Sequence, residues 1–350
     1  MRTEVKFSSR RFLMTLTLCA CSVILLQNYN IAGNSRFPQS LLSVFIGLSI
    51  CFLMFIPAII LKKRRDADVF TLLRHTGKAE RYVTAGFYLV YFIFTALYFL
   101  IPYTDMFCKK YYPDASPCLI APVLLVCCVY AAFKGANVIT RFGVFLFALA
   151  MLTNALLFGG SLPALDFENG SFDVQIEPGS LLQNVNYFIT PCFIAVIFAC
   201  LSSYTRNFKF RQPLLALVLT GLKFALVLFF ITFAVGEYAL RQEYQTYVLA
   251  RAAHFGTFAG IESFYMALST MSVFMIVSLL LCCMCRSVNQ NGRLPVISGF
   301  AAGVLVLYLA AHYFDSFKEL LTNPLLLNIL SFFAAVAVPL FRMIRGRGHA

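Results

Sequence analysis

The sequence predicts an all-α integral membrane protein with ten transmembrane helices. The 350 residues are 60% hydrophobic and only 12% charged, with a mean hydropathy of +0.80. A soluble core of this size would need far more charged surface. Long apolar stretches divide the chain, and most hold about 18 to 23 residues. That length crosses a hydrocarbon core of about 30 Å at 1.5 Å per residue.

These stretches follow one another along the whole chain, so we expect a single membrane domain, 1–350, without a soluble domain of any size. The first stretch has a basic flank, as a signal peptide would, but no small-residue cleavage site precedes its polar end. We interpret it as the first span. Pro117 and Pro122 predict an irregular outer end for the fourth span, which Lys134 closes. The predicted spans are residues 12–31, 40–61, 82–102, 118–133, 142–162, 187–204, 214–236, 263–285, 294–311 and 324–341.

The basic residues fall mainly in every second gap between the spans. Placing the N-terminus in the cytoplasm puts most of the 28 Lys and Arg on that side. The positive-inside rule therefore predicts that both termini are cytoplasmic. The net charge of +13 would suggest nucleic acid in a soluble protein. Here the topology and anionic inner-leaflet lipid explain it, so we expect membrane lipid and no nucleic acid as partners.

An even number of spans divides naturally into two sets of five. Residues 12–162 and 187–341 are the two predicted repeats. Because five is odd, the second repeat must be inverted in the membrane, as in many secondary transporters. In such folds the first helix of each repeat is broken at the binding site. Span one offers the small polar pair Cys21 and Ser22 for such a break, with Gln27 further out.

Span six offers Thr190 and Pro191 for the second break. Proline removes an intrahelical donor and clashes with the preceding turn, so we expect a kink or a break at position 191. A simple packing kink is the competing interpretation, because proline is common in membrane helices.

Lys223 is the one basic residue inside a span. It lies roughly 15 Å from the cytoplasmic end of span seven, too deep to reach either interface easily. A lysine at this depth costs about 2.5–3.5 kcal/mol on insertion. We expect it to face the bundle interior and to find carbonyl, water or acidic partners. It is either a contact to a ligand carboxylate or an ion pathway, or a structural anchor between helices.

Three further residues are candidates for the site. Tyr91 and Tyr98 are seven residues apart in span three and therefore share one helical face. They either line a site or only pack in the bundle. Glu262 lies at the outer entrance of span eight, where it is either part of an outer vestibule or an ordinary solvated helix end.

Several segments are similar to one known family. They are Phe7–Phe12 before the first span, Asp68, Val69 and Phe70 through Gly77 and Lys78 before the third, Lys134–Arg141 before the fifth, and Gly260, Ile261 and Glu262 at the eighth. The chain resembles the spore germination permeases, the B subunits of germinant receptors, in the amino acid, polyamine and organocation transporter superfamily. Lys134–Arg141 is the most specific match, since it is similar to the family's short turn between spans four and five.

The resemblance implies a LeuT-type fold and a role as the membrane subunit of a spore germinant receptor. It implies that a small nutrient germinant, such as an amino acid, binds between spans one, three, six and eight. The implied partners are the A and C subunits, and the implied location is the spore inner membrane. The chain departs from the family in having no tryptophan, and from the superfamily in placing Cys21 and Ser22 where glycines are frequent.

Two alternatives remain open. The chain could be an autonomous amino-acid permease coupled to protons or sodium, or a structural subunit that binds no ligand. No enzyme is expected, because the sequence lacks a phosphate-cradling glycine loop and a nucleophilic serine elbow. The four histidines fall in predicted loops or at the terminus without the Cys or acidic spacing of a zinc site, so we expect neither a metal nor a cofactor.

Overall fold

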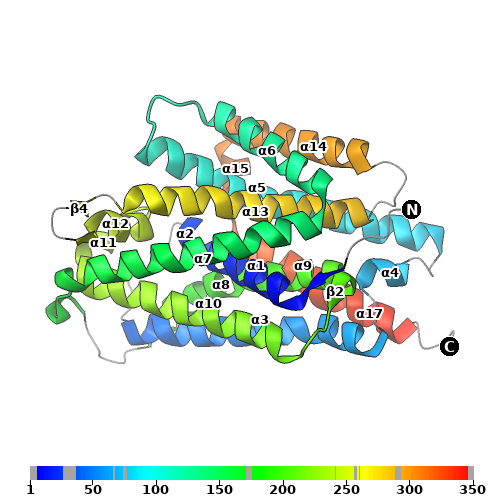
Figure 1. Ribbon diagram of the computed structural model, residues 1–350, viewed down its shortest axis with the longest axis horizontal. Coiled ribbons are helices and arrows are strands. Elements are labelled where there is room, and N and C mark those ends of the chain that lie inside the picture. Colours follow the sequence, from blue (N-terminus) through cyan, green and yellow to red (C-terminus); the bar gives the residue numbers. More distant parts are fainter. Residues whose placement is uncertain are drawn as a thin grey trace.

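The computed structural model shows long helices that run side by side along its longest axis (Figure 1). It describes residues 6–26, 37–65, 68–73, 77–170, 176–240, 242–255, 258–259, 261–287 and 293–345. Within these ranges, ten helices are long and apolar enough to cross a membrane. The predicted helical membrane fold and its number of spans are therefore confirmed. Residues 27–31 of the predicted first span, which include Gln27, lie outside the described ranges.

The spans keep the predicted order, and most begin or end a few residues away from the predicted bounds. In chain order they are α1 (Ser9–Cys21) with α2 (Val23–Leu26); α3 (Phe37–Arg65); α5 (Lys78–Lys110); α6 (Pro117–Lys134); α7 (Ala136–Ser161); α8 (Pro178–Ile189), η3 (Thr190–Cys192) and α9 (Phe193–Leu201); α10 (Arg211–Phe230) with the π-helix η5 (Ile231–Val235); α13 (Glu262–Ser287); α14 (Arg293–Tyr313); and α16 (Pro324–Phe332) with the π-helix η6 (Phe333–Ala337) and α17 (Val338–Arg345).

Short elements connect the spans. The helical ones are α4 (Val69–Leu73), η1 (Leu162–Ala164), η2 (Phe167–Asn169), η4 (Ser202–Tyr204), α11 (Glu237–Leu240), α12 (Gln245–Ala252) and α15 (Asp315–Leu321). Strand β1 (Phe7–Ser8) pairs in parallel with β2 (Thr205–Arg206), and β3 (His254–Phe255) pairs antiparallel with β4 (Phe258–Ala259). Spans four and five meet at the single residue Gly135, whose φ of 94° favours glycine because it lacks a Cβ.

The described residues keep the charge asymmetry that the sequence predicted. One end of the bundle, here called the basic end, is where α1 begins and where α6 and α13 finish at Lys134 and Arg286. The opposite end, here called the acidic end, is where α8 begins after Glu177 and where η2 follows Asp166. Short helix α12 also lies at the acidic end, next to α11 (Figure 1).

The first and sixth spans form the centre of the bundle. In their most apolar windows, 78% and 83% of the residues are buried, against 28% in both the fourth and the ninth span. Figure 1 shows α1, α8 and α9 in the middle, with α5 and α13 on one side and α3 and α10 on the other. The outer helix α6 instead exposes an apolar face that suits lipid, formed by Leu119, Val123, Val126 and Tyr130.

Both central spans are interrupted, while the seventh and tenth spans carry the π-helical segments η5 and η6. Ser22 separates α1 from α2, and η3 separates α8 from α9. These interruptions lie in the two spans that the five-plus-five division singled out. The inverted repeat itself, with halves 12–162 and 187–341, stays a prediction.

Candidate ligand site

The first interruption frees a backbone carbonyl in the middle of the bundle. In a continuous α-helix, the N–H of Leu25 would donate to the carbonyl of Cys21. Here it donates to the carbonyl of Ser22 at 3.1 Å. The Ser22 hydroxyl turns back to the carbonyl of Leu18 at 2.7 Å. The carbonyl of Cys21 thus needs a donor from elsewhere in the protein, because a buried polar group without a partner is costly.

Lys223 supplies that donor from α10. Its Nζ lies 3.5 Å from the carbonyl oxygen of Cys21, and the residue is 6% exposed. Among the described residues no carboxylate pairs with Lys223, so its predicted carbonyl partner is found and an acidic partner is not. An ammonium has three donors, and one hydrogen bond leaves two of them available to a ligand.

Two other side chains donate to carbonyls of the short helix α2. The hydroxyl of Thr246 on α12 lies 2.8 Å from the carbonyl of Ile24. The hydroxyl of Tyr265 on α13 lies 2.5 Å from the carbonyl of Leu25. The interrupted first span is therefore held by side chains from the seventh span, the eighth span and the connection between them.

The second interruption follows from Pro191. The N–H of Thr190 donates to the carbonyl three residues back, as in a 3-10 helix, because Pro191 has no N–H for that carbonyl. The carbonyl of Asn186 thereby loses its helical donor. Asn328 on α16 replaces it, with Nδ2 2.6 Å from the carbonyl oxygen of Asn186.

A thiol replaces the next missing donor. The N–H of Phe193 donates to the carbonyl of Thr190, three residues back, and this leaves the carbonyl of Ile189 without its helical partner. The Sγ of Cys51 on α3 lies 3.1 Å from this carbonyl oxygen. A thiol is a weak donor. Of the carbonyls freed by the interruptions, that of Ile189 has the weakest donor. A stronger donor, such as a ligand amine, could replace the Cys51 thiol there.

Two hydroxyls at the second interruption have no hydrogen bond within the part of the chain that the structure describes. They are Oγ1 of Thr190 and the phenol oxygen of Tyr98, on η3 and α5, and both residues are buried. The two groups are close enough to interact, but they are not in hydrogen-bonding geometry. An unsatisfied buried hydroxyl costs about 1–3 kcal/mol. A polar ligand at η3 would satisfy both.

The structure brings together only part of the predicted set. Cys21, Ser22 and Lys223 meet at the first interruption, whereas Thr190 and Pro191 form the second. Helix α1, which ends at the first interruption, packs directly on η3. Between them the two interruptions offer an ammonium, two hydroxyls and two weakly held carbonyls, a set that suits a small polar or zwitterionic molecule.

Tyr91 and Glu262 do not share this arrangement. The hydroxyl of Tyr91 is 3.0 Å from Oγ of Ser331 on α16, so it is already paired. Glu262 begins α13 at the acidic end, and its carbonyl accepts the Tyr111 hydroxyl at 2.5 Å. Burial, followed by the neighbouring Tyr247 and Glu262, raises the pKa of Tyr111 well above its ordinary value, so the phenol stays a donor.

Sequence reasoning missed four residues that hold the site, Asn328, Cys51, Thr246 and Tyr265. Asn328 could have been noticed as an amide four residues after the start of the apolar tenth span. Cys51 resembles any other apolar cysteine of a span, and Thr246 lies in a connection without a distinctive pattern. Their role depends on which spans are adjacent.

Among the described residues, ten helices are long and apolar enough to cross a membrane, and two of them are interrupted at the centre of the bundle, an arrangement that points to a transporter or a membrane receptor. The sequence model of the family described as "Spore germination protein" matches residues 4–314. The chain therefore belongs to this family of spore permeases, which implies a role in germination and in the sensing or transport of nutrients. No curated protein that was compared matches the chain.

Proposed function

We propose that this protein is the germinant-recognising membrane subunit of a spore receptor. The ligand would be a small nutrient, such as an amino acid, bound between the interruption at Ser22 and the one at Thr190–Cys192. The protein would act with the A and C subunits of the receptor in the spore inner membrane. Its basic end, and with it both termini, would face the cytoplasm.

The observation that carries this proposal is the chemistry left available at the two interruptions. A ligand carboxylate beside Lys223 would form a charge-assisted hydrogen bond, which is stronger than a neutral one. The hydroxyls of Thr190 and Tyr98 could donate to the same ligand or accept from it. The carbonyls of Cys21 and Ile189, whose partners among the described residues are a long contact and a thiol, could accept from a ligand amine.

Recognition would be converted into a signal by a shift between two conformations. A ligand drives such a shift only through a difference in its affinity for them. The site lies between the interrupted spans and α5, so a ligand bound there would favour the conformation in which these elements close around it. The altered arrangement would then be sensed by the A and C subunits.

The test is ligand-dependent thermal stabilisation of the purified protein across amino acids and other nutrients. We expect at least one nutrient to raise Tm by roughly 2 °C or more when saturating. The stabilisation should disappear in Thr190→Val and Tyr98→Phe. It should persist in Tyr103→Phe, a matched control on the same helix whose hydroxyl is already 2.9 Å from Thr270 Oγ1. No stabilising nutrient, or equal stabilisation in all three variants, would overturn the proposal.

The second candidate is an autonomous amino-acid permease driven by protons or sodium. Two interrupted helices in the middle of the membrane also favour this function, because secondary transporters bind their substrates at such places. Reconstitution in liposomes separates the two. Uptake of the stabilising nutrient, driven by an ion gradient and without other subunits, would support the permease. Binding without uptake would support the receptor subunit.

A further inference from the structure

Two cysteines lie at the acidic end of the bundle, outside the candidate ligand site. Cys108 is near the end of α5, and Cys118 is near the start of α6. Both are free thiols in this structure. Cys108 is buried, with 8% of the residue exposed, whereas Cys118 is partly exposed. The pair therefore combines one thiol that a water-soluble reagent can reach with one that is sheltered behind it.

A tight turn brings the two helix ends together. The chain reverses directly after α5, because the N–H groups of Tyr111 and Tyr112 both donate to the carbonyl of Phe107, at 3.1 and 3.2 Å. The rings of Phe107 and Tyr112 stack with their centres 5.2 Å apart. Helix α6 then begins at Pro117 and packs against α5. The start of α6 is thereby held beside the end of α5.

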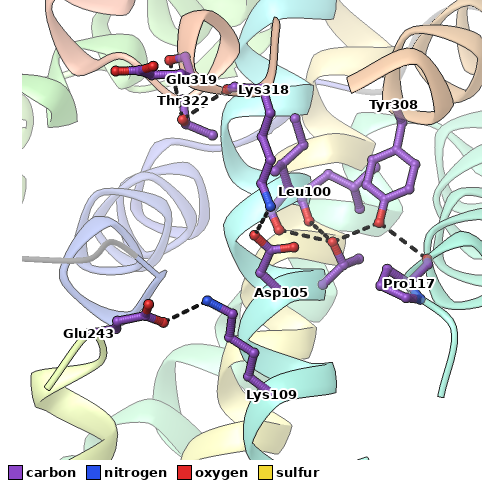
Figure 2. A network of polar contacts seen from close by, with 11 residues as sticks. Leu100, Asp105, Lys109, Pro117, Glu243, Tyr308, Lys318, Glu319 and Thr322 are labelled. Carbon is purple, nitrogen blue, oxygen red and sulfur yellow. Dashed lines mark hydrogen bonds and ion pairs between the residues drawn. The ribbon is translucent and has the colours of Figure 1, made fainter. Parts of the chain in front are cut away.

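A tyrosine of the ninth span joins the same two helices. The hydroxyl of Tyr308 on α14 lies 2.9 Å from Oγ1 of Thr104 on α5 and 3.2 Å from the carbonyl oxygen of Pro117 on α6. Figure 2 shows this phenol between the two helices. On the same stretch of α5, Asp105 is ion-paired with Lys318 of α15 at 2.5 Å (Figure 2). These contacts fix the relative position of the two helix ends.

The position of each cysteine in its helix places the two thiols on either side of this phenol. Cys108 follows Thr104 by four residues and so lies on the same face of α5. Cys118 directly follows Pro117. The two thiols are close enough to interact electrostatically with each other, and both are close enough to interact with Tyr308. A disulfide requires two cysteines that are neighbours in the fold, and this pair meets that condition.

We propose that Cys108 and Cys118 are a redox-active pair that forms a disulfide across the turn 109–117. The oxidant would be a low-molecular-weight disulfide that reaches the acidic end. The positive-inside rule predicts that this end faces away from the cytoplasm, on the side where protein disulfides persist. The inference needs no nutrient and stands apart from the proposed function.

The bond would form by two exchange reactions. The partly exposed Cys118, as its thiolate, attacks one sulfur of the small disulfide, forms a mixed disulfide and releases the first small thiol. Cys108, as its thiolate, then attacks the sulfur of Cys118 and releases the second small thiol. Two protein thiols are oxidised to one disulfide, one small disulfide is reduced to two thiols, and the two protons from the cysteines end on the released thiols.

The disulfide would restrain the part of α5 that contacts neighbouring segments at the acidic end. Lys109 pairs at 2.8 Å with Glu243, just before α12. The Tyr111 hydroxyl donates at 2.5 Å to the carbonyl of Glu262, where α13 begins. A cross-link over a short loop limits the conformations of the unfolded chain and so stabilises the folded one. Oxidation is therefore expected to make the acidic end more resistant to unfolding.

The experiment uses the full-length protein in lipid nanodiscs. One sample is treated with glutathione disulfide and one with dithiothreitol, and the remaining thiols are blocked with N-ethylmaleimide. Trypsin cleaves after Lys109 and Lys110, so Cys108 and Cys118 fall on different peptides that only a disulfide keeps joined. We expect mass spectrometry to find the joined peptides in the oxidised sample and not in the reduced one.

The decisive variant is Cys118→Ser, in which the joined peptides should be absent. Cys127→Ser is the matched control, because Cys127 is an exposed cysteine of the same helix and of the same tryptic peptide, and the joined peptides should persist. Oxidation should raise Tm by roughly 3 °C or more in the parent protein and in Cys127→Ser, but not in Cys118→Ser.

Three outcomes would overturn the proposal. They are the absence of joined peptides from the oxidised parent protein, their persistence in Cys118→Ser, and the same Tm for the oxidised and the reduced parent protein. Thermal unfolding of the reduced samples shows whether each variant is folded. If Cys118→Ser does not fold, Cys118→Ala takes its place, because alanine removes the thiol without adding a hydroxyl.

Discussion

The ammonium nitrogen of Lys223 lies 3.5 Å from the carbonyl oxygen of Cys21, the last residue of α1. Lys223→Met keeps the apolar stem and removes the donors. We expect normal membrane insertion, because removing a central lysine relieves about 2.5–3.5 kcal/mol. Ligand affinity should fall at least about tenfold, which corresponds to losing one hydrogen bond to a charged group.

Titration of the purified variant with the stabilising nutrient measures the loss in affinity. Lys109→Met is the control, because Lys109 is an exposed lysine at the acidic end. Unchanged affinity in Lys223→Met would show that Lys223 is only an anchor between α10 and the first span.

Two tyrosine hydroxyls should respond in opposite ways to removal. Tyr265 donates to the carbonyl of Leu25, so Tyr265→Phe should lower the free energy of unfolding by about 1–3 kcal/mol. Tyr98 has no hydrogen bond among the described residues, so Tyr98→Phe should leave the ligand-free protein equally stable or more stable. Thermal unfolding without ligand compares the two variants. A clear loss of stability in Tyr98→Phe would mean that its hydroxyl is already satisfied.

The side chain of Asn328 should stabilise the backbone at the second interruption. Asn328→Leu fills a similar volume but leaves the carbonyl of Asn186 without its donor. We expect faster amide hydrogen exchange in α8 near η3 and a loss of about 1–3 kcal/mol in the free energy of unfolding. Hydrogen exchange with mass spectrometry measures the first effect. Asn323→Ala is the control, since it removes only the cap of α16 at Leu325 N–H. Equal exchange near η3 in both variants would contradict this role.

Thr246 should link α12 to the first interruption. Thr246→Val keeps the shape of the side chain and removes the donor to the carbonyl of Ile24. We expect faster exchange in α2 and a loss of about 1 kcal/mol of stability. Thr322→Val is a matched control, because the Thr322 hydroxyl donates within its own segment, to the carbonyls of Lys318 and Glu319 (Figure 2). The role is contradicted if both variants leave α2 equally protected.

The spans were predictable because hydropathy is a local property of the sequence. Lys223 was predictable for a related reason, since its depth follows from its distance to the span ends. The acceptor of Lys223 was not predictable from the sequence. The carbonyl of Cys21 lacks a helical donor only because the N–H of Leu25 donates to the carbonyl of Ser22 instead. That choice is made by the tertiary structure.

The tyrosines of the third span show the same limit. Spacing places Tyr91 and Tyr98 on one face of α5, but it does not say which hydroxyl finds a partner. Ser331 on the tenth span satisfies Tyr91, and this leaves Tyr98 as the better candidate for ligand contact. Two residues two turns apart thus differ through a neighbour more than two hundred positions away.

The contact between Ser9 and Gln212 has a consequence for biosynthesis. The two residues are 203 positions apart in the chain. At about 5–20 residues per second, the ribosome takes roughly 10–40 s to make the intervening segment. The first span is therefore in the membrane without its hydrogen bond to Gln212 until the sixth span and the start of the seventh have been synthesised. The pairing of β1 with β2 likewise forms only after the sixth span has been synthesised, while the last four spans are still to come.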